Sequence, residues 1–382
     1  MMDYKETKSF ELTCISPIHI GSGESLRPFE YLYDKQKGKV YLINHSKWVA
    51  MLSDKGLMEE YVVFIEGSKQ LEGLNLWQWL RNKGVSNQEI LASSSRCAEA
   101  PYSVLAKDKK SLNSLNSGMS LPDGQLYIPG SSIKGVLRTG ILYHLLEASS
   151  KIEIYQSKLE AELENKSNIR KLKTSSFIEN DLLTALCYDV KRNKDSINCA
   201  LKGLQVSDAM PVEKYDTIAV QKLDASVKIK KSGESESRLP LCRECIRPGA
   251  KFRFTISLDL PMMKTIGISS IDEILEYAHK AKLAEINLLK LFFSADYKNQ
   301  IKEAEAADFS IGAGTGFLNK TLWTGLYDDR EAMVRGIKTI LSDSFKKHNH
   351  FKDSGISPRT LKLAEVNGKK QMMGLCSLQE VK

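Results

Sequence analysis

The chain has 382 residues, of which 42% are hydrophobic, and a formal net charge of +8. This length can bury one large core or two modest ones, and the absence of an apolar run of about 18 residues predicts no membrane span. The basic excess favours a polyanionic partner. Seven cysteines without a regular framework, and a start that does not resemble a secretory leader, predict a cytoplasmic protein.

The first part of the chain predicts strands followed by helices. Residues 8–20 form a strand in this interpretation, because Phe10, Leu12 and Cys14 alternate with polar positions. Residues 29–43 repeat the alternation on both sides of a turn, which is typical of a hairpin. From 47 to 90 the apolar residues take helical spacing, so we expect a helical insertion there.

Residues 126–138, Leu-Tyr-Ile-Pro-Gly-Ser-Ser-Ile-Lys-Gly-Val-Leu-Arg, predict a strand, a tight turn and a helix. Ser131 or Ser132 can cap this helix, and Lys134 and Arg138 lie one helical turn apart. Free amides and two cations at a helix start favour phosphates, so these four residues are candidates for RNA binding. The alternative is a capped helix with two solvated cations.

The second half alternates helices and strands in the same way. A second helical insertion is expected at 151–202, followed by strands at 204–208, 217–230 and 251–259 and a helix at 270–293. The order fits an α+β fold with a ferredoxin-like βαββαβ plan and helical insertions. This order alone leaves open whether the chain forms one such core or two.

A basic stripe covers residues 222–253, which contain nine Lys or Arg and only four Asp or Glu. The polar stretch 231–238 lies between two expected strands, Ala219–Lys230 and Lys251–Asp259, and predicts a projecting hairpin that contacts RNA. An ordinary solvated face is the alternative. The candidate RNA-binding residues of this stripe are Lys222, Lys228, Lys230, Lys231, Arg238, Arg243 and Arg247.

Three motifs occur in an order that resembles the RAMP superfamily of CRISPR proteins. They are Ile15-Ser-Pro-Ile-His-Ile-Gly-Ser-Gly23, the 126–138 segment and the glycine-rich loop Ile311-Gly-Ala-Gly-Thr-Gly-Phe317. Four further strings, at 204–209, 221–224, 243–249 and 358–362, are similar to the family of fifth subunits of type III-A CRISPR (Csm) effector complexes.

The resemblance implies an RNA-binding subunit that contacts the 3′ part of the CRISPR RNA (crRNA), caps a filament of backbone subunits and is needed for crRNA maturation. It implies neighbouring Csm backbone subunits as partners, a host trimming nuclease acting in trans as a further candidate partner, and only indirect contact with target RNA. It also implies two ferredoxin-like modules, residues 1–203 and residues 204–382, with a thumb-like hairpin near 219–253 in the second. Gly312, Gly314 and Gly316 would let the backbone approach a sugar–phosphate chain closely.

Two other functions stay open on sequence alone. His19, beside the Gly21–Gly23 turn, could act as general base of a metal-independent endoribonuclease, although a buried structural histidine is the alternative. The loop 311–317 could instead hold a small-molecule phosphate. The segment 24–30 lacks the aspartate of target-cutting family members, which argues against catalysis. Cys242 and Cys245 have the spacing of half a zinc site, but nothing completes it, so we expect no metal and no cofactor.

Overall fold

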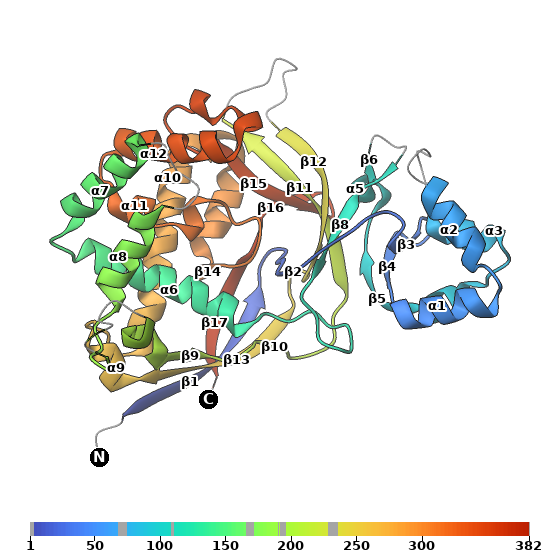
Figure 1. Cartoon of the computed structure of the whole chain (residues 1–382), viewed down its shortest axis with the longest axis horizontal. Coiled ribbons are helices and arrows are strands. Elements are labelled where there is room, and N and C mark those ends of the chain that lie inside the picture. The colour runs from blue at the N-terminus through green and yellow to red at the C-terminus, as the bar shows by residue number, and fades with distance from the viewer. Residues whose placement is uncertain are drawn as a thin grey trace.

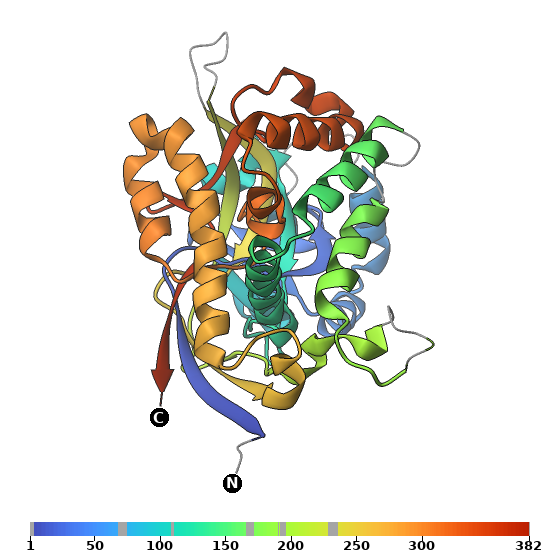
Figure 2. The same cartoon turned by 90° about the vertical axis from the view of Figure 1, so that its left-hand side faces the viewer.

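The first strand of the chain lies inside a sheet whose other strands come from distant parts of the sequence. The computed structural model describes residues 4–67, 75–107, 111–165, 172–189, 191, 196–227 and 236–381. Within them, β1 (Lys5–Cys14) pairs antiparallel with β13 (Lys251–Asp259) on one side and with β17 (Leu375–Val381) on the other. Figure 2 shows β1 and β17 side by side, at the end of the molecule where both termini lie.

This six-stranded sheet follows the expected βαββαβ plan. β9 (Leu204–Val206) and β10 (Met210–Pro211) pair with β13, and β14 (Phe309–Ser310) pairs with β17. The side chains of α6 (Gly130–Glu147) and α10 (Ile271–Ala306) share one hydrophobic core with β1 and β13. The chain order β1, α6, β9, β13, α10, β17 therefore confirms a ferredoxin-like α+β architecture.

A nine-stranded sheet is built from the segments inserted between these elements. Its order is β2-β8-β12-β11-β5-β4-β3, with β15 on β11 and β16 on β15. The bounds are β2 (Gly21–Leu26), β3 (Tyr31–Asp34), β4 (Lys39–Ile43), β5 (Ser94–Glu99), β8 (Ser114–Gly118), β11 (Thr217–Ser226), β12 (Glu236–Cys245), β15 (Thr360–Val366) and β16 (Lys369–Met372), while β6 (Ala106–Lys107) and β7 (Ser111–Leu112) pair separately.

Helices cover the two ends of the molecule (Figure 1). The end with the β3–β4 hairpin carries α1 (His45–Asp54), α2 (Met58–Gly67), α3 (Leu76–Asn82), α4 (Asn87–Ala92) and α5 (Tyr102–Leu105). The other end carries α6 and α10 with α7 (Ile152–Glu164), α8 (Lys173–Leu183), α9 (Leu260–Lys264), α11 (Trp323–Leu326) and α12 (Arg330–Ser344). None of the helices in the described ranges has the length and apolar character needed to cross a bilayer.

Three details differ from the sequence-based expectation. The expected modules 1–203 and 204–382 are interleaved, because both sheets take strands from both halves of the chain. The expected hairpin partner of β11 was wrong: β11 pairs with β12, while Lys251–Asp259 joins the other sheet. Helix α10 is longer than expected, because a second helical stretch continues to Ala306 beyond a kink at Tyr297.

Candidate nucleic-acid interface

The glycine-rich loop Ile311–Phe317 leaves β14 and packs against the turn that follows β1. Gly312, Gly314 and Gly316 have φ angles of 87°, 94° and 106°, which other residues rarely adopt. A Cβ on Gly312 would lie 2.5 Å from the His19 carbonyl oxygen, and the Ala313 amide donates to that oxygen at 2.8 Å. Two of the three family-like motifs, the glycine-rich loop and the segment that contains His19, are thus in close backbone contact.

Arg243, on β12, carries its guanidinium to this loop. Its Nη1 lies 3.3 Å from the position that a Cβ would take on Gly314 and 3.8 Å from Sδ of Met373. Burial lowers the pKa of Arg243. Within the described part of the chain no carboxylate forms an ion pair with Arg243, so this half-buried cation is available to an external anion.

Three lysines are grouped with Arg243: Lys222 and Lys320 interact with its charge, and Lys362 interacts with the charge of Lys222. Lys222 on β11 and Lys362 on β15 share the carboxylate of Asp224, at 3.3 Å and 2.9 Å from its Oδ1. Burial, followed by repulsion from Lys362 and Arg243, lowers the pKa of Lys222 to about 8. Partial desolvation and the charge of Arg243 lower the pKa of Lys320, which follows the glycine-rich loop. We call these four cations the cationic cluster: Lys222, Arg243, Lys320 and Lys362. Among the described residues, Asp224 forms ion pairs with two of them, Lys222 and Lys362.

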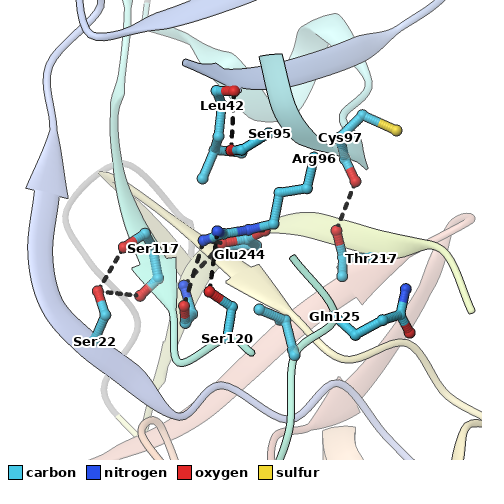
Figure 3. Close-up of polar contacts among 12 residues, drawn as sticks. Ser22, Leu42, Ser95, Arg96, Cys97, Ser117, Ser120, Gln125, Thr217 and Glu244 are labelled. Carbon is cyan, nitrogen blue, oxygen red and sulfur yellow. Dashed lines mark hydrogen bonds and ion pairs between the residues drawn. The ribbon is translucent and has the colours of Figure 1, made fainter. Parts of the chain in front are cut away.

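A buried ion pair fixes the strand that carries Arg243 (Figure 3). Glu244 is completely buried, and both of its carboxylate oxygens accept from Arg96 on β5, at 2.7 and 2.9 Å. The amide of Gly118 on β8 donates to the same carboxylate at 2.8 Å. Because successive strand residues point to opposite faces, holding Glu244 on one face directs Arg243 to the other.

Two members of the cationic cluster were missed by the sequence analysis. Lys362 ends a string that resembles the fifth-subunit family, and Lys320 lies just beyond the glycine-rich loop. Their positions next to family-like motifs are the signal in the sequence that could have identified them as site residues. The sequence does predict Lys222, Arg243 and Gly314 as site residues, and the structure brings these three together from separate elements.

The N-terminus of α6 is occupied by the protein itself. The helix begins at Gly130 with Pro129 as its N-cap, so the expectation that Ser131 or Ser132 caps it was wrong. The Gly130 amide instead donates to Oδ1 of Asp208 at 2.7 Å. A carboxylate therefore already sits where the sequence predicted a phosphate.

The two cations of α6 also have partners within the chain. Lys134 donates to the carbonyl oxygens of Leu201 and Leu204, at 2.9 and 2.6 Å, and burial lowers its pKa. Arg138 forms an ion pair with Glu179 on α8. Since both side chains join α6 to neighbouring segments, the cationic cluster is the better candidate for binding phosphates.

The other candidate residues of the basic stripe do not belong to the cationic cluster. Arg238 pairs with Glu365 at 2.5 Å, and Arg247 lies 3.6 Å from Glu99 and 3.8 Å from Asp216. The other three candidates, Lys228, Lys230 and Lys231, lie outside the described residues.

His19 is buried, with 3% of its surface exposed, and its Nδ1 lies 2.6 Å from the Glu244 carbonyl oxygen. Burial lowers the pKa of His19, so the imidazole is neutral and donates from Nδ1 to that oxygen. This hydrogen bond joins the turn after β1 to β12. The geometry matches the structural alternative for His19, and no described residue donates a hydrogen bond to its Nε2.

Cys242 and Cys245 do not face each other. Cys242 packs with the core of the β3–β4 hairpin and Cys245 with the core behind the glycine-rich loop, so they lie on opposite faces of β12. Within the residues that the structure describes, no three His, Cys, Asp or Glu side chains are placed to hold a metal ion.

Comparison with known proteins gives results along nearly the whole chain. A family model described as the RAMP superfamily matches residues 11–319. A Mycobacterium tuberculosis (strain CDC 1551 / Oshkosh) protein named CRISPR system Cms protein Csm5 is 23% identical over 390 residues, with 97% of each chain covered. A protein of the same name from Enterococcus italicus is 24% identical over 88% of this chain and 85% of its own length.

Two solved structures share the fold. A chain of the cryo-EM structure of a Csm–crRNA–target RNA ternary complex of a type III-A CRISPR-Cas system superposes with a TM-score of 0.70 at 17% identity, covering 98% of this chain and 100% of that one. The crystal structure of T. onnurineus Csm5 gives a TM-score of 0.62 at 16% identity, covering 96% and 99%.

Proposed function

Because this chain belongs to the RAMP superfamily, we propose that it is a non-catalytic RNA-binding subunit of a type III-A CRISPR (Csm) ribonucleoprotein complex. In this proposal it binds the 3′ part of the crRNA, caps the filament of neighbouring Csm subunits and is needed for crRNA maturation. A host nuclease recruited in trans would trim the RNA, and target RNA would be contacted only through the crRNA.

The cationic cluster is the observation that carries this proposal. Arg243 and Lys320 have no carboxylate partner among the described residues, and they lie beside the glycine-rich loop, where the missing side chain of Gly314 leaves room for the Arg243 guanidinium. Cations of this kind bind phosphates without distinguishing bases, as a subunit that must accept many guide sequences requires. The cluster lies at the base of the β11–β12 hairpin, the element that the sequence predicted to contact RNA.

The alternative, an endoribonuclease with His19 as general base, has less support. RNA cleavage by acid–base chemistry needs two groups that reach the same phosphate. His19 is almost fully buried and its Nδ1 is engaged by a carbonyl oxygen, while Arg243 lies near enough to disfavour a second positive charge.

The proposal is tested by purifying a tagged form of the chain from its host and sequencing the RNA that accompanies it. We expect RNAs that share a repeat-derived 5′ tag, together with the other subunits of the complex. The variant R243Q/K320Q should recover less RNA, whereas K251Q/R253Q, which removes the same two charge types from β13, should recover the normal amount. Random cellular RNA, or a bound small nucleotide in place of RNA, would contradict the proposal.

A further inference from the structure

Two phenylalanine side chains lie in solvent in the turn that follows α12. Phe345 and Phe351 are 50% and 59% exposed, whereas the other ten phenylalanines of the chain are buried or half-buried. The turn contains two short helices, η5 (Lys346–His348) and η6 (His350–Lys352). Because two large apolar rings in one segment are left unburied by the fold, this segment has the character of a binding surface.

The same residues, 345–352, are strongly basic, and we call them the basic aromatic segment. They include three lysines and no Asp or Glu. Lys346 and Lys347 are exposed, and neither forms an ion pair within the described part of the chain. The Nζ of Lys352 lies over the ring of Phe351, 5.4 Å from its centroid. Cations interleaved with exposed aromatic rings are typical of surfaces that bind single-stranded nucleic acids.

The backbone of the basic aromatic segment is held from inside. The side chain of Asp353 is completely buried, forms an ion pair with Arg359 and lies 3.0 Å from Nδ1 of His350. The guanidinium of Arg359 also donates to the carbonyl oxygens of His348 and Asn349, each at 3.1 Å. These contacts fix the backbone that carries the exposed rings, which lowers the entropy lost when a ligand binds.

One of the exposed rings belongs to a group of three. The centroid of the Phe345 ring lies 5.7 Å from that of His348 and 6.4 Å from that of His350. The two imidazoles are 5.9 Å apart, with 6° between their planes. Flat rings of this kind are surfaces on which nucleobases stack, and stacking accepts any base.

The basic aromatic segment and the cationic cluster are joined through the same two strands. Arg359 directly precedes β15, which carries Lys362, and its carbonyl oxygen accepts from the amide of Val227, just beyond β11. From Lys222 to Ser226, β11 spans about 13 Å, at about 3.3 Å per residue. A single RNA strand is therefore long enough to contact both sites.

We propose that the basic aromatic segment is a second RNA site, at which Phe345 and Phe351 stack on unpaired bases while Lys346 and Lys347 bind the neighbouring phosphates. This inference rests on the proposed RNA-binding function and adds contacts with bases to the phosphate contacts of the cationic cluster. Stacking does not depend on the base sequence, which suits a subunit that accepts many guides. Duplex RNA is disfavoured, because its bases are already stacked on one another.

The test uses the full chain and single-stranded oligouridine that contains 2-aminopurine, a base whose fluorescence is quenched when it stacks. We expect F345A/F351A to bind this RNA about tenfold more weakly and to lose the quenching. F345Y/F351Y, which keeps both rings, should retain both signals. Y4A/Y188A removes two rings that are at least as exposed, and it should behave like the wild type.

Two further measurements separate the rings from the lysines. An abasic strand with the same number of phosphates should bind equally to the wild type and to F345A/F351A. K346Q/K347Q should lower the log–log salt slope by about 1.4, at about 0.7 per phosphate contact, whereas K5Q/K47Q, with the same loss of charge at exposed positions elsewhere, should not.

The outcomes distinguish this inference from the proposed function. Unchanged affinity and quenching in F345A/F351A, while R243Q/K320Q binds more weakly, would overturn the basic aromatic segment alone. Absence of RNA binding by the wild type would overturn both. An equal loss of affinity for the abasic strand would also refute stacking. So would binding to phosphatidylserine vesicles that F345A/F351A abolishes without any change in RNA binding, because the segment would then be a membrane surface.

Discussion

Removing Arg243 and Lys320 together should change how RNA binding depends on salt. These are the two members of the cationic cluster without a carboxylate partner in the described residues, whereas Lys222 and Lys362 share Asp224. If each binds one phosphate, R243Q/K320Q lowers the log–log salt slope by about 1.4, at about 0.7 per contact with single-stranded RNA. Between about 50 and 200 mM salt, the wild type should then lose roughly sevenfold more affinity than the variant.

The assay is a titration of labelled single-stranded RNA at several salt concentrations, with circular dichroism to establish that the variants are folded. K251Q/R253Q is the matched control, because Lys251 and Arg253 belong to the same basic stripe but pair with Glu11 on the other sheet. Its slope should equal that of the wild type. An unchanged slope in R243Q/K320Q, or an equal decrease in the control, would refute the assignment of phosphate contacts to the cationic cluster.

Three further outcomes follow from buried groups and from the glycines. His19→Asn should lower the free energy of unfolding in urea by about 1–3 kcal/mol, with no RNA cleavage by either protein in Mg²⁺ or EDTA; a cut that only the wild type makes, at equal stability, would favour the endoribonuclease. Burial raises the pKa of Glu285 to about 8, so the folded chain keeps a proton that the unfolded chain releases near 4.5. Stability should therefore fall as the pH rises from 5 to 8, by up to about 1.4 kcal/mol per pH unit, and Glu285→Gln should remove this slope. If the unfolding free energies of the wild type and of Glu285→Gln fall in parallel with pH, the raised pKa of Glu285 is contradicted. Gly314→Ala should destabilise the fold more than Gly23→Ala, since both have φ near 95° but only the first would bring a Cβ to 2.7 Å from another atom, and equal melting temperatures would contradict this.

Local patterns in the sequence were sufficient for many elements. The alternation of Phe10, Leu12 and Cys14 predicts β1, and the turn at 35–38 predicts the β3–β4 hairpin, because both signals lie within a few residues. The same holds for β13, whose alternating apolar residues face the helices α6 and α10. The family resemblance added the order of these elements.

Pairing between distant segments could not be predicted in this way. β12 has a polar sequence with Pro240 at its centre, so it does not look like a sheet strand. Some of its charged side chains pair with residues far along the chain, Glu244 with Arg96 and Arg238 with Glu365. The more apolar β13 lies nearby in the sequence, so the pattern favours β13 over β12 as the second strand of the hairpin.

The candidate site could be predicted only in part, because it too depends on contacts between distant segments. Local charge and the resemblance identified Lys222 and Arg243, but only the fold brings Lys362 beside them. Conversely, Lys134 has the spacing of a phosphate-binding residue, yet it donates to the carbonyl oxygens of Leu201, before β9, and of Leu204, the first residue of β9. Charge patterns therefore indicate which cations exist, and tertiary contacts decide which of them remain available to an external anion.

The central place of β1 in its sheet has a consequence for biosynthesis. Cys14 on β1 is opposite Cys376 on β17, and Cys376 is translated only after more than three hundred further residues. Until then one edge of β1 has no native strand to pair with, and unpaired edges are sites of aggregation. A nascent chain that stalls before β17, or a gene truncated there, should therefore depend on chaperones or other subunits made alongside it.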